Sequence, residues 1–495
     1  MAGFMIAAPR SGSGKTMVTC GILELLKRKQ KNPFSYKCGP DYIDGLFHRK
    51  VLGIEGGNLD SFFEQPQDIR EKYAAVSETH FPVVEGVMGY FDGLGGDTTA
   101  ASSWEVADIL NLPVVLVVDA KGASLSLAAL IKGFQVFQGE SQSSQANKNG
   151  NHIQAVILNR ISPMLYPRMK AVIEKKTGVL VAGYVPELDF WQVGSRHLGL
   201  VLPGEIENLQ EQMRQLGDCL EKTLDVDVLL KLGEKADIDV LGSVTVTADG
   251  SSQKCEAQKN ADLVLQNQFA GEKISHSAIP IRLGVAWDEA FCFYYRDNLE
   301  FLEKQGVQIV QFSPVHDKHL PDDLDGLLLG GGYPELYAKA LEENETIRNE
   351  IRRKAEEDMP ILAECGGYLY LLKELEDENG TGYGMAGVFS GKGYKKGKNS
   401  HFGYITVQTE KDSLYLKAGE TIKGHEFHYW ESTQDENELK MQAKKPTGKR
   451  SWPCVTVKNQ VMAGFPHLYY PSLEGFGERF VQACDRYRMK RKRQQ

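Results

Sequence analysis

The sequence lacks the features that identify several large classes of protein. Its eight cysteines form no Cys-x-x-Cys pair and follow no regular spacing, which argues against a disulfide framework and against a cysteine-based zinc site. The apolar amino terminus, residues 1–8, is far too short to span a bilayer and lacks the basic residues that open a signal peptide. We therefore expect a protein of the reducing cytoplasm with no membrane partner.

A strong charge of one sign is also missing. The net charge of −9 over 495 residues is mild, and no nucleic-acid partner is expected, because such proteins usually present a dominating basic face. Basic residues gather only at 486–493, which we interpret as a solvated helix end. With 42% hydrophobic and 25% charged residues, the composition is that of an ordinary globular protein, and the length predicts two domains or at most three.

What the chain does have is an alternation of short apolar runs with amphipathic stretches. Continuous Val, Ile and Leu runs separated by helical segments indicate parallel strands that are covered by helices on both faces. The fold class is therefore predicted as α/β and doubly wound. The runs in the first half of the chain are Phe4–Ala8, Phe34–Cys38, Pro82–Glu85, Val114–Asp119, Ile153–Asn159 and Leu180–Val185.

This alternation stops once and then restarts. Residues 243–280 are polar with little periodicity, and we interpret them as a linker between a first domain at 1–242 and a second α/β domain at 281–495. Two other polar stretches, 138–151 and 433–450, are predicted to be surface loops, because neither can bury enough apolar area to order itself. The strands expected in the second domain are Ile281–Ala286, Val307–Phe312, Leu327–Leu329 and Pro360–Ala363.

A phosphate-binding loop is indicated where the first predicted strand ends. The sequence Arg10-Ser11-Gly12-Ser13-Gly14-Lys15-Thr16 lies between that strand and a helix expected to begin near Lys15. In such a loop the backbone N–H groups point at phosphates, the lysine neutralises β and γ oxygens, and the hydroxyl of Thr16 can bind Mg²⁺. The match to G-x-x-x-x-G-K-[ST] fails at Pro9, which stands where the first glycine belongs. The residues assigned to ATP are Ser11, Gly12, Ser13, Gly14, Lys15 and Thr16.

Acidic residues near predicted strand ends are candidates for the metal site. Glu85 and Asp119 each end an apolar strand, and the carboxyl ends of parallel strands line the ligand crevice of an open sheet. Either could hold Mg²⁺ directly or through water, and a plain turn-forming role is the alternative. Asp41-Tyr42-Ile43-Asp44 follows the second strand, and this placement of two aspartates around an aromatic residue can face both metal-bound phosphate and a polar substrate.

A nucleophilic cysteine is indicated in the second domain. Cys365 stands in Glu364-Cys365-Gly366-Gly367, between an apolar strand and a stretch of helical character. A tight strand-to-helix turn exposes the thiol, and helix N-terminal amides favour the thiolate. A glycine run at 330–332 lies upstream and offers backbone amides. We assign Gly331, Gly332 and Gly366 to an oxyanion hole.

The cysteine needs a base, and three histidines compete for that role. His467 follows an apolar segment about 100 residues downstream and is our choice. His425 and His428 are the alternatives, and spacing alone does not decide among the three.

Together these motifs resemble those of a known family. Residues 11–16, Gly39-Pro40-Asp41-Tyr42-Ile43-Asp44, Asn58-Leu59-Asp60, residues 85–93 and Arg196-His197-Leu198-Gly199-Leu200 look like the successive signatures of the cobyrinate a,c-diamide synthase family. The second domain resembles the class I glutamine amidotransferase domain that this family carries. The similarity covers nearly the whole chain except the linker and the polar insertions.

The resemblance implies a dethiobiotin-synthetase-like ATP domain joined to a glutaminase. L-glutamine would be hydrolysed at Cys365 with His467 as activator, and the ammonia would pass internally to the other site. There ATP and Mg²⁺ would phosphorylate the c and then the a acetate carboxylate of cobyrinate, and ammonia would displace the phosphate. Class I amidotransferases usually have a glutamate two residues after the histidine, but this chain has Tyr469, which implies a Cys–His dyad.

The resemblance also suggests roles for the acidic positions. We assign Thr16, Asp41 and Glu85 to Mg²⁺, and we assign Asp41, Tyr42, Asp44 and Asp92 to the substrate and phosphoryl site. The nearest rival substrates are hydrogenobyrinate and nickel sirohydrochlorin, because the enzymes that amidate them share the motifs. A rival of another class is a P-loop regulatory or partitioning ATPase with a degenerate second domain. The oligomeric state is left open, with a homodimer as one option.

Overall fold

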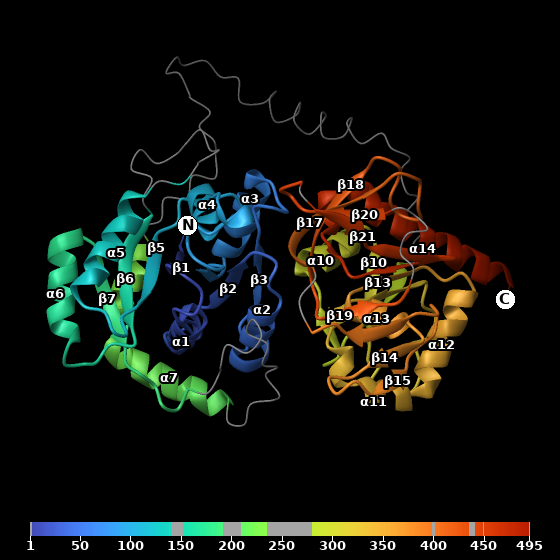
Figure 1. Cartoon of the computed structure of the whole chain (residues 1–495), viewed down its shortest axis with the longest axis horizontal. Coiled ribbons are helices and arrows are strands. Elements are labelled where there is room, and N and C mark those ends of the chain that lie inside the picture. Colours follow the sequence, from blue (N-terminus) through green and yellow to red (C-terminus); the bar gives the residue numbers. More distant parts are fainter. Residues whose placement is uncertain are drawn as a thin grey trace, which may run out of the picture.

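The computed structural model describes residues 2–137, 139, 152–191, 209–234, 280–397, 401–434, 441–448 and 450–494. These residues form two α/β domains that lie side by side (Figure 1). The predicted fold class is confirmed. The first domain ends in the described chain with α8 (Val226–Glu234), and the second begins with β8 (Ile281–Ala286). The boundaries at 242 and 280 fall at or beside residues outside the described ranges and stay predictions.

The first domain is built on a seven-stranded sheet in which every neighbouring pair is parallel. Its central strands are long runs of β-branched and apolar residues that are buried on both faces, as a sheet covered on both sides requires. In spatial order the strands are β3 (Gly56–Leu59), β2 (Pro33–Cys38), β4 (Phe81–Glu85), β1 (Phe4–Ala7), β5 (Val114–Asp119), β6 (Ile153–Asn159) and β7 (Leu180–Val185).

Helices cover both faces of this sheet and enclose two separate apolar layers. One layer packs beneath α3 (Pro66–Ser77), α4 (Ser103–Leu110), α5 (Leu125–Val136) and α6 (Tyr166–Thr177). The opposite layer packs beneath α1 (Lys15–Arg28), α7 (Leu209–Thr223), α8 and the short pair α2 (Ile43–Phe47) and η1 (His48–Leu52).

All six strands predicted in this half are present, and α1 begins at the predicted Lys15. Strand β3 was not predicted. Its sequence Gly-Gly-Asn-Leu lacks the β-branched and aromatic residues that identify strands, and it lies at the sheet edge beside β2. The stretch 138–151 falls outside the described residues except for position 139.

The second domain is built on a six-stranded sheet that contains all four predicted strands. Its pairs are parallel except the edge pair β22–β23. In spatial order the strands are β10 (Val307–Phe312), β8, β11 (Gly326–Leu329), β13 (Ile361–Glu364), β23 (Val461–Gly464) and β22 (Val455–Lys458). The helices of this domain are α10 (Arg296–Lys304), α11 (Ala338–Glu343), α12 (Glu345–Glu356), α13 (Gly366–Leu371) and α14 (Glu474–Gln494).

Smaller sheets add to this second domain. A five-stranded antiparallel layer packs with α14 over one face of the main sheet, a two-stranded piece pairs β12 with β9, and a four-stranded piece adjoins α13. Their strands are β9 (Phe291–Phe293), β12 (Gly331–Gly332), β14 (Glu374–Glu376), β15 (Gly382–Gly384), β16 (Lys392–Lys395), β17 (Phe402–Thr409), β18 (Thr421–Phe427), β19 (Trp430–Ser432), β20 (Met441–Lys444), β21 (Ser451–Pro453) and β24 (His467–Leu468).

Strand β20 corrects the prediction that 433–450 is a surface loop. Met441 and Ala443 point into the core and are fully buried, and β20 pairs with β17 on one side and β21 on the other. A four-residue strand with two inward positions gains its stability from neighbours supplied by distant sequence, so its own polar composition is a poor guide. The basic run 486–493 does lie in a helix, α14, but Arg488 within it is buried and donates to Asp485.

The two domains meet through an aromatic cluster and a partly buried ion triad. The cluster contains Tyr42 and Phe63 from the first domain and Tyr295 and Tyr469 from the second. In the triad, Nζ of Lys72 lies 2.5 Å from Oε1 of Glu64 in its own domain and 2.9 Å from Oδ2 of Asp297 in the other. Burial alone would lower the pKa of Lys72, but the carboxylates of Asp297 and Glu64 outweigh it and raise that pKa.

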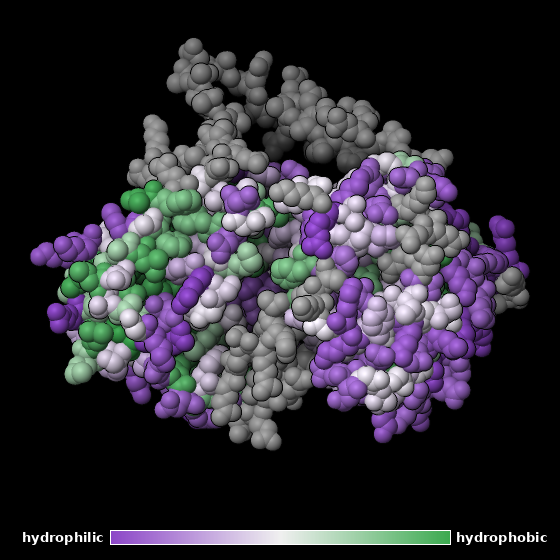
Figure 2. Space-filling model, in the orientation of Figure 1, coloured by the Kyte–Doolittle hydropathy of each residue, from purple (hydrophilic) through white to green (hydrophobic). Residues whose placement is uncertain are grey.

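On the face shown in Figure 2, apolar residues gather on the first domain and the second domain is largely hydrophilic. Among the described residues, no helix is both long enough and apolar enough to cross a bilayer.

Candidate active sites

The phosphate-binding loop has the shape its motif predicts. Gly14 caps α1 with φ 94°, a left-handed conformation that favours glycine, and a β-carbon there would lie 2.3 Å from Nδ2 of Asn159. That same Nδ2 donates to the carbonyl of Ser13 at 2.8 Å, while the Ser13 hydroxyl donates to the carbonyl of Arg10 at 2.9 Å. Asn159 ends β6 and was not predicted as a site residue; it fixes the loop from the neighbouring strand end. Ser11 and Gly12 are exposed at the loop tip.

Lys15 and Thr16 begin the helix behind this loop. The Lys15 ammonium donates to the carbonyl of Met88, and burial, aided by the nearby Lys37 charge, lowers the pKa of Lys15 to about 8. The Thr16 hydroxyl donates to Oε1 of Glu85 at 2.7 Å. Thr16, which follows β1, and Glu85, which ends β4, therefore meet at one end of the sheet, as predicted for a parallel fold.

The centre of this cluster is a residue that the sequence analysis missed. Nζ of Lys37 lies 2.5 Å from Oδ2 of Asp44, 2.9 Å from Oε1 of Glu85 and 3.9 Å from Oδ2 of Asp41. Burial works to lower the pKa of Lys37, but these carboxylates outweigh it and raise that pKa. The available signal was a lysine within the inner, fully buried run of β2, a position where an unpaired cation is too costly to occur.

The carboxylates respond differently to the same cation. Burial raises the pKa of Asp41 to about 6 and that of Glu85 to about 7, while for Asp44 the Lys37 ammonium outweighs burial and lowers the pKa. The site therefore contains one firmly ionised carboxylate and two whose charge depends on what binds beside them.

The residues also fit a divalent cation held chiefly by phosphate. Oε2 of Glu85 is buried and has no hydrogen-bond partner among the described residues, and the Thr16 hydroxyl lies on the other oxygen of the same carboxylate. In the described chain no group of three His, Cys, Asp or Glu side chains is arranged to hold a metal by itself. Mg²⁺ usually binds through one or two protein oxygens, several waters and substrate phosphates, which is what this arrangement offers.

Two other predicted acidic residues have different surroundings. Oδ2 of Asp92 accepts a hydrogen bond from the N–H of Gly89 at 2.9 Å, and its charge acts on Lys15. Asp119 is engaged by two guanidinium groups: Nε of Arg160 donates to it at 3.0 Å and a nitrogen of Arg10 lies 3.5 Å away. These cations outweigh burial and lower the pKa of Asp119. A metal role for Asp119 is therefore not supported by its contacts, whereas Glu85 remains the better candidate.

The cysteine lies on a strained turn between β13 and α13. Cys365 has φ 49° and ψ −102°, an unfavourable conformation for a residue with a side chain, and such strain is typical of functional positions. Its N–H donates to the carbonyl of Gly464 at 2.8 Å, which fixes the turn to β23. Burial and the charge of Glu335 raise the pKa of the Cys365 thiol, while the N–H of Gly366 opposes this rise, so the resting group is a buried neutral thiol and not the exposed thiolate expected from the sequence.

The predicted oxyanion-hole glycines lie together beside this turn. Gly331 and Gly332 form β12, and a β-carbon on Gly366 would lie 2.9 Å from the backbone nitrogen of Gly332. The N–H of Gly367 donates to the carbonyl of Gly330 at 2.9 Å, which holds the two segments at this spacing. Their role as donors to a developing oxyanion stays a prediction.

His467 lies at the same glycines. A β-carbon on Gly331 would stand 2.3 Å from Cε1 of His467, so only glycine permits the ring to approach this closely. Burial, with a smaller contribution from His428, lowers the pKa of His467 to about 3, which keeps the imidazole neutral and able to accept a proton.

The two competing histidines are occupied by other partners. His425 faces His467 across the β18–β24 pair, their rings stack at 4.9 Å and 17°, and Nδ1 of His425 bonds the Tyr295 hydroxyl at 2.8 Å. Nδ1 of His428 donates to the carbonyl of Trp430 at 2.6 Å. This geometry favours His467 as the base, and its catalytic role remains a prediction.

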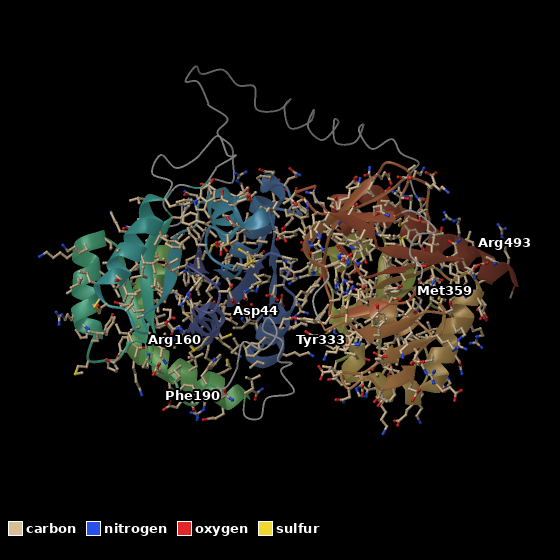
Figure 3. All side chains as sticks on the ribbon, viewed as in Figure 1. Asp44, Arg160, Phe190, Tyr333, Met359 and Arg493 are labelled. Carbon is tan, nitrogen blue, oxygen red and sulfur yellow. The ribbon has the colours of Figure 1, made fainter. Side chains whose placement is uncertain are left out.

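The side chains of Tyr469 and Tyr42 point into the contact between the two domains, and neither points into the site of its own domain. The ring of Tyr469 stacks on Phe63 at 4.9 Å and its hydroxyl donates to Asp297 at 2.9 Å, so it does not replace the absent glutamate behind His467. Tyr42, which we had assigned to the substrate and phosphoryl site, has its ring 5.4 Å from the ring of His467. Asp44, two residues away, and Tyr333 of the second domain lie on the facing sides of the two halves (Figure 3).

Comparison with protein families identifies both halves. Residues 4–200 match the CobQ/CobB/MinD/ParA nucleotide binding domain, and residues 282–473 match the CobB/CobQ-like glutamine amidotransferase domain. The Arg196–Leu200 motif lies outside the described residues, so its place in the fold is not assigned.

Full-length relatives match along almost the whole chain. A protein named cobyrinate a,c-diamide synthase from Caldanaerobacter subterraneus subsp. tengcongensis is 36% identical over 98% of this chain and 98% of its own length. Proteins of the same name from Streptococcus sanguinis and Salmonella typhimurium are each 37% identical, over 94% and 86% of this chain and 95% and 85% of their own lengths.

Proposed function

Because this chain belongs to the cobyrinate a,c-diamide synthase family, we propose that it amidates the a and c acetate carboxylates of cobyrinate with ATP and the nitrogen of L-glutamine. It is a glutamine-dependent ligase with a nucleotide-binding domain and an amidotransferase domain. The observation that carries the proposal is that one chain holds a phosphate-binding loop and a strained elbow cysteine with a neutral histidine beside the same glycines.

The glutaminase half would start from a neutral pair. The Cys365 sulfur attacks the amide carbon of glutamine while its proton passes to the neutral imidazole of His467, which then protonates the amide nitrogen so that it leaves as ammonia. The N–H groups at Gly331, Gly332 and Gly366, which lie beside this turn, would stabilise the oxyanion. Water then cleaves the thioester and releases glutamate. The low pKa of His467 keeps the base unprotonated at rest, and the entry of glutamine must raise that pKa for the imidazole to hold the proton it receives.

The synthetase half would solve a different problem. A carboxylate resists attack by ammonia because its carbonyl carbon is already electron-rich, so a better leaving group is needed. The carboxylate oxygen attacks the γ-phosphorus of ATP, ADP leaves, and ammonia displaces phosphate from the acyl phosphate to form the amide. Lys15 and the N-terminus of α1 would hold the triphosphate. Thr16 and Glu85 would hold Mg²⁺, which neutralises phosphate charge when bound.

The acidic segment has a role in the same step. Lys37 holds Asp44 and Glu85 in fixed positions and leaves Asp41 at 3.9 Å, so one buried cation faces three carboxyl groups. Lys37 offsets part of the negative charge in a site that must admit polyanionic ATP and an anionic substrate together. The pKa values of about 6 and 7 at Asp41 and Glu85 allow either carboxyl to take a proton when anionic ligands enter.

The decisive test compares nitrogen donors and macrocycles. Purified protein is incubated with ATP, Mg²⁺ and either glutamine or ammonium, with cobyrinate, hydrogenobyrinate and nickel sirohydrochlorin as separate substrates, and amides are counted by mass spectrometry. We expect two amidations of cobyrinate. Cys365→Ala should lose the reaction with glutamine and keep it with ammonium. Failure of wild-type protein to amidate any of the three with either donor would refute the proposal, and amidation of another macrocycle alone would reassign the substrate.

A further inference from the structure

The segment that carries Asp41 and Asp44 also reaches the glutaminase site. Oδ1 of Asp41 accepts the N–H of Ile43 at 2.9 Å, and Oδ2 of Asp44 is held by Lys37 at 2.5 Å. The backbone on both sides of Tyr42 is therefore tied to the charged cluster of the first domain. The side chain of Tyr42 points the other way and is buried among residues of the second domain.

Tyr42 lies in a pocket built almost entirely of rings. Its ring centroid is 4.6 Å from that of Tyr295, 5.5 Å from that of Phe293 and 5.5 Å from that of His425. The centroid of His467 lies 5.4 Å away at an interplanar angle of 44°. Residues from the first domain thus complete the wall around the predicted base of the second.

Among the described residues, no polar group fixes the ring of the base through its Nδ1. Nδ1 of His467 is buried without a hydrogen-bond partner among the described residues, and the position two residues on is Tyr469, which is engaged at Asp297. The ring is instead held by the edge contact at Gly331, the stacked ring of His425 and the ring of Tyr42. Of these three, only Tyr42 belongs to the other domain.

We propose that Tyr42 is a positioning residue for His467, and that it makes glutamine hydrolysis depend on the state of the Asp41–Asp44 segment. The inference rests on the proposed function, in which that segment borders the ATP and carboxylate site. Ligands that shift the segment move the Tyr42 ring, and the ring in turn changes the orientation of the imidazole. Hydrolysis of glutamine would then be fastest when the acceptor site is filled.

The test replaces the ring and measures glutamate release by itself. For Tyr42→Ala we expect a 10- to 100-fold fall in the kcat of glutaminase with the KM for glutamine within about 3-fold, because misplacement of a catalytic group by about 1 Å costs a factor of this order. Tyr42→Phe keeps the ring and should restore kcat to within about 2-fold. Amidation with ammonium should stay within about 3-fold in both variants. Tyr42→Leu, which keeps apolar volume without a flat ring, replaces Tyr42→Ala if the latter does not fold.

The matched control is Phe63→Ala. Phe63 belongs to the same interdomain cluster, but its ring contacts in the described chain are with Phe62, Tyr295, Tyr404 and Tyr469, not with His467. We expect its glutaminase kcat to remain within about 3-fold of wild type. Equal losses in the Phe63 and Tyr42 variants would mean general loosening of the contact and would overturn the proposal.

Coupling between the two sites is measured as the change in the rate of glutamate release when ATP, Mg²⁺ and cobyrinate are added to the same assay. Wild type and Tyr42→Phe should release glutamate faster in their presence, and Tyr42→Ala should not respond. A Tyr42→Ala or Tyr42→Leu protein with wild-type kcat and wild-type stimulation would overturn the inference. That result would leave the proposed function intact, since the function is judged on amide formation by the wild-type protein.

Discussion

The ammonium of Lys37 lies 2.9 Å from Oε1 of Glu85, the same oxygen that accepts the hydroxyl of Thr16 at 2.7 Å. One carboxylate oxygen thus joins the phosphate-binding loop to the acidic segment at Asp44. The cation is buried with its partners, so its removal leaves charges that water cannot reach.

Replacing Lys37 with Gln should lower the free energy of unfolding by about 3–5 kcal/mol, because Asp44 and Glu85 would remain buried without their cation. Urea denaturation followed by circular dichroism measures the change. Lys29→Gln is the control, since Lys29 pairs with the exposed Asp227 and should matter by less than about 1 kcal/mol. Equal effects of the two substitutions would show that the buried cluster is not held by Lys37.

Chelation of divalent cations should separate the two half-reactions. With excess EDTA, amide formation should stop while the basal release of glutamate from glutamine continues, because the residues that fit Mg²⁺ are Thr16 and Glu85 in the first domain. Glu85→Gln should raise the Mg²⁺ concentration for half-maximal amidation at least about 10-fold, as loss of a charged ligand weakens a hard cation site. An unchanged Mg²⁺ requirement in that variant would remove Glu85 from the metal site.

Gly331→Ala should disable the glutaminase and spare the synthetase. The new methyl group would stand 2.3 Å from Cε1 of His467, so the imidazole must move, and glutamine-driven amidation should fall by about 100-fold or more. Amidation with ammonium should stay within about 3-fold. Gly133→Ala is a matched control at an exposed position of α5 with no atom within 4 Å of the added carbon, and it should gain roughly 0.5–1 kcal/mol of stability. Full glutaminase activity in Gly331→Ala would contradict the placement of His467.

Glu364 should make stability fall as the pH rises. Burial raises the pKa of this carboxyl to about 8, although Leu468 N–H and the Tyr470 hydroxyl both donate to its Oε1 and oppose the shift. In the unfolded chain the same group ionises near pH 4.5. Between these values the unfolded state binds fewer protons, so the stabilising contribution of the buried acid is complete below pH 4.5 and is lost as the pH rises towards 8.

Glu364→Gln tests this directly, because the amide keeps an acceptor for both donors but cannot ionise. The difference in unfolding free energy between the variant and wild type should shift in favour of the variant by on the order of 3 kcal/mol between pH 5 and 8.5. Urea denaturation at several pH values measures it, and other titrating groups cancel in the difference. Parallel pH curves for the two proteins would disprove the assignment.

Most strands of the two large sheets could be predicted from the sequence because they need little context. Val114–Asp119 and Ile281–Ala286 are mainly apolar runs, and both strands have the predicted limits. Strands β3, β22 and β23 of these sheets and the strands of the smaller sheets were not predicted. For β3 and β20 the reason is that their own residues, Gly-Gly-Asn-Leu and Met-Gln-Ala-Lys, carry weak strand preferences. Burial of Met441 and Ala443 is decided by β17 and β21 and not by the polar stretch around them.

The candidate sites also contain some residues that the sequence could predict and others that it could not. Lys15, Thr16 and Cys365 follow from short motifs, because each motif couples a residue type to a local turn that the chemistry requires. The central position of Lys37 could not be predicted from the residues around it, because it depends on the pairing of β2 with β4, which brings Glu85 beside Lys37. The direction of the Tyr42 ring depends on the second domain, which begins more than 200 residues later. Contacts between domains are set by folded surfaces, which no single stretch of sequence contains.

The triad at Lys72 limits how the two halves can move. Its cation comes from α3 and one of its anions, Asp297, from the first turn of α10, so a wide swing apart would break the Lys72–Asp297 pair and leave Lys72 with Glu64 alone. The loss of that pair, together with the loss of the aromatic contacts between the domains, opposes such a swing. In the proposed function, ammonia would then pass from one domain to the other through small local shifts, while the contact between the domains stays closed.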